Sequence, residues 1–189
     1  VTTSGESDES GLSMNVALGK RHAGATTNQL DPASVGALVA RVLALARVAP
    51  EDPEVMPVLG AQKVPPSAAF DDAAAKLTAG QRADAAKVTI ETAKSKGLVI
   101  AGFIEHFGGV SALATSAGFA SQQKLSFVEM TTTARTPDGS GSGWAGFTSR
   151  KGGELDAAKL AAVACEKAAL SKTPRKLDAG RYTVLLEPA

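Results

Sequence analysis

The clearest fold signal in the chain is the stretch KLSFVEMTTTA, residues 124–134. Its many β-branched residues favour a β-strand, in which successive side chains point to opposite faces of a sheet. One face of this strand would carry the odd-numbered side chains Leu125, Phe127, Glu129 and Thr131. The glycine-rich segment 137–143 predicts a hairpin connection, and 144–149 predicts the returning strand, with Trp144, Gly146 and Thr148 on one face.

Working outward from this hairpin, short strands and amphipathic helices follow one another. The chain predicts strands over 12–18, 21–27 and 98–107, the last with a possible continuation over 110–114, and a final strand over 181–187. Helices are predicted from Asp31-Pro32 to Pro50, from Thr78 to Gly97 and from about Asp156 to Ser171. Runs of hairpin-connected strands with packed helices predict an α+β fold with an antiparallel or mixed sheet.

Proline and glycine mark the predicted domain limits. A stretch rich in proline, with Pro57, Pro65 and Pro66, carries no periodic pattern and predicts an extended arm over 56–66. We therefore expect residues 1–55 to end an N-terminal domain and 67–176 to form a central domain. Residues 177–189 would open a third domain with its first strand.

Composition narrows the class of protein. The chain has 189 residues and a formal net charge of +1, with basic residues scattered, which argues against a nucleic-acid-binding surface. No apolar run approaches the roughly 20 residues that span a bilayer, and we expect no membrane partner. The first ten residues lack a signal-peptide pattern. With a single cysteine, Cys165, no intrachain disulfide can form. Because proteins of the reducing cytoplasm usually lack disulfides, we expect a cytoplasmic location.

The residues alone predict no catalytic, cofactor-binding or metal-binding site. The two histidines, His22 and His106, lie far apart, so a helical zinc motif with two histidines on one face is excluded. Glu105 and His106 would point to opposite faces of a strand. Cys165 lies on the apolar stripe of the last helix and is expected to be a buried structural thiol. The glycine run 139–143 lacks the lysine and helix of a phosphate-binding loop.

Several short segments nevertheless occur in a familiar order, and together they are similar to the TldD/PmbA family, also called modulators of DNA gyrase. They include LSMNVAL (12–18), RHAGATTN (21–28), LALAR (43–47), APEDP (49–53), TSAGF (115–119), MTTT (130–133), the alanine-rich helix 161–170 and GRYTVLLEP (180–188). The last of these is the most specific, since it resembles a segment that opens the family's C-terminal domain.

The resemblance implies a function. Members of that family pair a zinc-bearing subunit with a zinc-free homologue and cleave small or unfolded peptides, and their HExxxH zinc helix lies in the C-terminal domain. We therefore expect a non-catalytic, substrate-framing and dimerising segment of a zinc metallopeptidase. Zinc would be held only by a further domain or by a partner subunit. The alternative is a free-standing peptide- or protein-binding module without peptidase activity.

Two structural expectations accompany this hypothesis. Exposed strand edges around Lys124–Arg135 and Trp144–Arg150 would enclose an extended peptide substrate. The rings of Phe119 and Trp144 would be buried packing anchors, because the chain has few aromatic residues.

Overall fold

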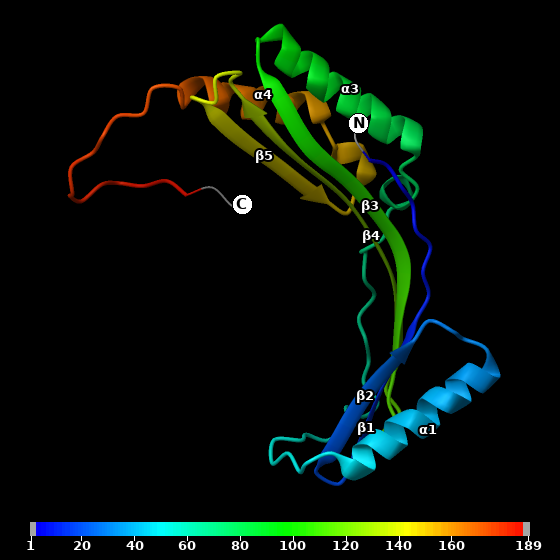
Figure 1. Ribbon diagram of the computed structural model, residues 1–189. Helices are drawn as coiled ribbons and strands as arrows, with labels where there is room; N and C mark the ends of the chain where they lie inside the picture. Colours follow the sequence, from blue (N-terminus) through cyan, green and yellow to red (C-terminus); the bar gives the residue numbers. More distant parts are fainter. Residues whose placement is uncertain (1–2, 187–189) are drawn as a thin grey trace. The chain divides into compact units, whose positions relative to one another are not determined.

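The computed structural model describes residues 3–186, which form two compact units (Figure 1). Residues 3–60 and 115–118 form the first, here called the hairpin unit. Residues 61–114 and 119–186 form the second, called the sheet unit. Each combines antiparallel strands with helices, so the predicted α+β class is confirmed.

The hairpin unit contains strands β1 (Leu12–Leu18) and β2 (Arg21–Thr27), which pair antiparallel over their full length as predicted. Gly19 lies in the turn at a φ of 62°, a conformation that costs glycine little. Helix α1 (Pro32–Val48) packs against this hairpin.

Helix α1 begins where the sequence predicted. The Asp31 carboxylate accepts hydrogen bonds from the N–H groups of Ala33 and Ser34, and both bonds lower the pKa of Asp31, the bonds with Ser34 most. On its inner face the helix buries Leu38, Val42 and Ala46.

After α1 the chain runs back beside β2. Arg21 donates a 3.0 Å hydrogen bond to the carbonyl of Ala49, and the Asp52 N–H donates to the carbonyl of Lys20. Residues 55–71 form neither helix nor strand apart from a bridge between Gly60 and Gly118. The units divide in sequence after residue 60, inside the predicted arm. The domain limits predicted from the sequence stay a prediction.

The sheet unit contains three antiparallel strands in the order β3-β4-β5. They are β3 (Val99–Ala114), β4 (Ala120–Arg135) and β5 (Ser142–Ser149). β3 is one continuous strand of 16 residues, which includes the continuation considered at 110–114. The hairpin predicted at 137–143 is confirmed, with Ser142 opposite Arg135.

An Asp138 turn closes that hairpin. Its carboxylate accepts hydrogen bonds from the N–H and the hydroxyl of Ser140. Together with the Thr136 hydroxyl, which has the largest effect, these groups lower the pKa of Asp138 to about 2. The first part of the glycine run, residues 139–141, thus lies in the hairpin connection, and Ser142 and Gly143 already belong to β5.

Three helices cover one face of the sheet: α2 (Asp72–Ala75), α3 (Ala79–Ser95) and α4 (Ala157–Leu170). A short 3₁₀ helix, η1 (Gly152–Glu154), contacts α2. Figure 1 shows α3 and α4 on the same side of the strands. Even-numbered side chains of β4 from Ser126 to Ala134 are buried beneath these helices, whereas the odd-numbered ones are half-buried, as the alternation predicted.

Helix α4 lies directly against the backbone of β5. Its small residues Ala161, Ala164, Cys165 and Ala168 are completely buried. A Cβ atom added to Gly143 would overlap backbone atoms of Ala164 and Ala168. Helix and strand therefore approach each other closely through small residues. Burial raises the pKa of the Cys165 thiol, partly offset by Lys96, in line with the expected structural role.

The Asp71 side chain joins α2 to η1. Its carboxylate accepts hydrogen bonds from the Gly152 N–H at 3.0 Å and from the Ala74 N–H at 2.9 Å, and these lower the pKa of Asp71 in that order. The Asp71 N–H donates to the hydroxyl of Ser126 on β4. Asp71 is thereby the N-cap of α2.

One predicted element is missing. Residues 181–186 of the strand expected over 181–187 belong to no sheet, and Glu187 lies outside the described residues. A strand needs a neighbour for its backbone hydrogen bonds, and within residues 3–186 none pairs with this segment. No helix in the same range is long and apolar enough to cross a membrane.

Replacing Gly143 with Ala should destabilise the fold by about 1–3 kcal/mol, because the new methyl group would push α4 away from β5. Gly153→Ala is the matched control, since a Cβ at Gly153 meets nothing within 4 Å, and it should change the free energy of unfolding by less than about 0.5 kcal/mol. Urea unfolding of both variants measures the difference. Equal stability of the two would refute the close contact.

Candidate functional site

The face of the sheet opposite the helices is here called the open face. It carries the odd-numbered residues of β3 and β4 and the even-numbered residues of β5, as the register shows. Large apolar side chains are exposed on it: Val99 (56%), Phe103 (55%), Phe107 (45%), Leu113 (58%) and Trp144 (42%). A concentration of exposed apolar side chains on one face is typical of a surface that binds a partner or ligand.

The aromatic rings of the open face are ordered by their neighbours. Phe107 stacks on Phe127 across the β3–β4 pair, with 5.5 Å between ring centroids and an interplanar angle of 21°. The Trp144 ring lies over Gly146, which has no side chain to displace it. Each ring therefore has a neighbour within the sheet and still offers exposed apolar area that another chain could contact.

The expectation that Trp144 is a buried anchor is wrong. Its side chain points to the face that the helices leave uncovered, whereas its neighbours Gly143 and Ala145 are buried under α4. The alternation placed Trp144, Gly146 and Thr148 together correctly, but alternation does not tell which face is covered. The other expected anchor, Phe119, is half-buried.

Two carboxylates lie opposite each other in the middle of the open face. Glu105 on β3 pairs directly with Glu129 on β4, and Thr148 of β5 lies on the other side of Glu129. Neither glutamate side chain has an ion pair or hydrogen bond within residues 3–186. Like charges directly opposite on adjacent strands repel each other, so we expect this pair to destabilise the free chain.

The expected exposed edge at Lys124–Arg135 needs correction over Val128–Arg135, whereas Lys124–Phe127 pairs with β3 alone. β4 is the central strand, and from Val128 to Arg135 it pairs on both sides. The sheet edges are β3 and β5. The other expected edge, Trp144–Arg150, does fall largely on β5, where the Ser171 hydroxyl bonds both the N–H and the C=O of Ser142.

The two histidines lie in different units. His106 is on the helix-covered side of β3, with Nδ1 3.2 Å from Arg82 Nη1, so Glu105 and His106 do point to opposite faces as expected. His22 pairs with Asp52 at 3.5 Å in the hairpin unit. No three His, Cys, Asp or Glu side chains among the residues described gather closely enough to hold a metal ion.

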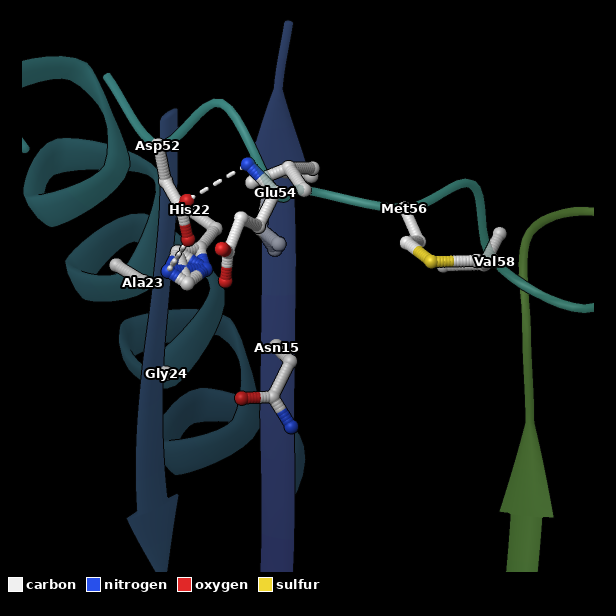
Figure 2. Close-up of a pocket in the computed structure, with 11 residues that line it drawn as sticks. Asn15, His22, Ala23, Gly24, Asp52, Glu54, Met56 and Val58 are labelled. Carbon is white, nitrogen blue, oxygen red and sulfur yellow. Dashed lines mark hydrogen bonds and ion pairs between the residues drawn. The ribbon is translucent and has the colours of Figure 1, made fainter. Parts of the chain in front are cut away.

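The His22–Asp52 pair borders a hollow of about 450 Å³ between β1, β2 and the segment after α1. Figure 2 shows the His22 ring beside the Asp52 carboxylate, which also accepts a 2.9 Å hydrogen bond from the Glu54 N–H. The side chains of His22 and Asp52 are 57% and 38% exposed, so water screens their interaction. A second hollow of about 470 Å³ adjoins Phe70 and Asp71.

Replacing either glutamate with glutamine should stabilise the chain, by up to about 1 kcal/mol, because the cross-strand repulsion disappears. This result would be unusual, since most substitutions destabilise. Thermal unfolding of Glu105→Gln and Glu129→Gln at low salt provides the measurement, and the gain should shrink in high salt as the charges are screened. A loss of stability in both variants would show that the carboxylates do not repel.

Comparison with known proteins finds relatives by structure only. No protein-family model matches the chain, and no curated protein sequence matches it. Several solved structures do, among them the following two. A proposed modulator of DNA gyrase from Bacteroides thetaiotaomicron matches with a TM-score of 0.79 and 18% identity over 92% of this chain. A proposed modulator of a DNA gyrase from Thermotoga maritima matches with a TM-score of 0.73 and 14% identity over 85% of this chain.

The chain corresponds to less than half of each of these proteins, namely 42% of the Bacteroides protein and 37% of the Thermotoga protein. At such low identity the likeness establishes the fold and leaves the activity open. The chain therefore has the α+β fold found in part of two proposed modulators of DNA gyrase.

Proposed function

We propose that this chain is a non-catalytic, substrate-framing and dimerising segment of a TldD/PmbA-type zinc metallopeptidase that acts on small or unfolded peptides. Its fold, shared with part of two longer proteins that carry the family's older name, supports the proposal. The observation that carries the proposal is the open face with its exposed aromatic rings.

An extended peptide fits the chemistry of this face. Aromatic rings contribute large contact areas at little cost in conformational entropy. β3 and β5 are the edges of the sheet, and an edge can donate and accept main-chain hydrogen bonds to an added strand. Such contacts hold a substrate irrespective of most of its sequence, which suits a peptidase that acts on unfolded chains.

In this proposal the catalytic step takes place elsewhere. Zinc would be bound by a further domain or by a homologous partner subunit, and the partner would also complete the dimer. The open face would hold the peptide in an extended conformation. A holding role of this kind needs side chains that contact substrate and no group that transfers a proton.

Peptide binding should be visible in the fluorescence of Trp144, the only tryptophan in the chain. We expect peptides from a casein digest to shift its emission to shorter wavelength and to protect it from acrylamide, because a bound peptide would cover the ring. Phe103→Ala should weaken binding about five- to thirtyfold, the usual effect of removing an interface aromatic. Val48→Ala is the control, since the Val48 side chain is exposed at the end of α1 in the hairpin unit. This variant should bind the peptides as tightly as the unchanged chain. Unchanged emission at saturating peptide would count against the framing role.

The partner can be tested in the cell that makes the chain. An affinity-tagged copy should recover a longer homologous subunit whose sequence contains HExxxH, together with about one zinc ion per such subunit, since stable subunit interfaces survive purification. If the tagged chain binds peptides but recovers no such subunit, the free-standing binding module becomes the better description.

A further inference from the structure

The apolar side chains of the open face surround a centre of negative charge. Along β3, Phe103 and Phe107 lie two residues before and two residues after Glu105, on the same face. Across the sheet, Glu129 doubles the charge at this point, and Phe127 extends the apolar surface beside it. A ligand that covers this face must therefore bring apolar groups and neutralise two carboxylates.

We propose that the open face selects extended peptides in which a lysine or arginine is flanked, at the positions two residues before and two residues after it, by apolar side chains. This inference rests on the proposed function and names the class of peptide that the segment holds. Charge complementarity carries it, because two carboxylates without partners among residues 3–186 attract one cationic side chain and repel an acidic one.

The spacing follows from strand geometry. Side chains two residues apart in an extended chain lie about 6.5–7 Å apart on the same side. A peptide that runs along β3, in either direction, therefore repeats the spacing of Phe103, Glu105 and Phe107. Its central cation would reach Glu105 and Glu129, and its two flanking apolar side chains would meet the two phenylalanines.

The neighbouring rings strengthen the preference for a cation. Phe103, Phe107 and Phe127 present π-electron density near the two carboxylates, and aromatic faces attract ammonium and guanidinium groups. Binding of a cation would also relieve the repulsion between Glu105 and Glu129, so the chain should be more stable to heat when such a peptide is bound.

Three fluorescein-labelled peptides test the proposal by anisotropy. They share one sequence with leucine at the two flanking positions and differ only at the centre, which is lysine, norleucine or glutamate. The lysine peptide should bind about three- to tenfold more tightly than the norleucine peptide at low salt, as expected for contacts of one cation with two half-buried carboxylates. The glutamate peptide should bind most weakly, and added salt should reduce these differences.

The double variant Glu105→Gln/Glu129→Gln should lose the preference for lysine and still bind the norleucine peptide. Glu91→Gln, which removes one carboxylate from the exposed side of α3, is the control and should keep the preference. Thermal unfolding confirms that each variant is folded.

The outcomes distinguish failure of the preference for a basic residue from failure of the peptide-framing role. Equal affinity for the lysine and norleucine peptides overturns the basic preference and leaves the framing role intact. Failure of all three peptides and of the casein peptides to bind overturns the framing role as well. Should light scattering show a dimer that Phe103→Ala dissociates, a second copy of the chain covers the open face and the peptide proposal is wrong.

Discussion

The sheet unit depends on one contact, the packing of helix α4 directly on the backbone of β5. Gly143 offers no side chain, and the alanines and Cys165 of α4 bring the helix against the strand. The core beside this contact is built from small residues such as Ala134 and Ala145, together with Leu98. A tightly packed layer of small side chains compensates for the scarcity of aromatic residues in the core, because dispersion contacts are numerous when backbones approach closely.

The packing of the helices on one face of the sheet also decides which face stays free to bind a ligand. Since α2, α3 and α4 all contact one face of the sheet, the large side chains left over gather on the other. Phe103, Phe107 and Trp144 stay partly in water, which costs free energy in proportion to their apolar area. The repulsion between Glu105 and Glu129 adds to this cost. Features that destabilise a free chain and would be relieved by a ligand commonly mark binding sites.

The similarity to solved structures identifies the fold of this chain and does not identify its activity. The chain matches less than half of each solved relative at 14% and 18% identity, and folds of this kind are reused for different tasks. The proposed peptide-holding role therefore rests on the chemistry of the open face, whereas the peptidase assignment rests on the resemblance of short segments and the shared fold. These two lines of support are independent.

The sequence by itself determined whatever is encoded locally. Caps at Asp31 and Thr78 marked the starts of two helices, and the two-residue period over 124–134 separated the two faces of β4, because both signals act within a few residues. Only the tertiary structure decided which face the helices cover, so Trp144 is exposed where burial was expected. It also made β4 central, left 181–186 without a neighbouring strand, and set Glu105 opposite Glu129. The physical reason is that strand pairing and burial depend on segments far apart in the chain, which no local pattern records.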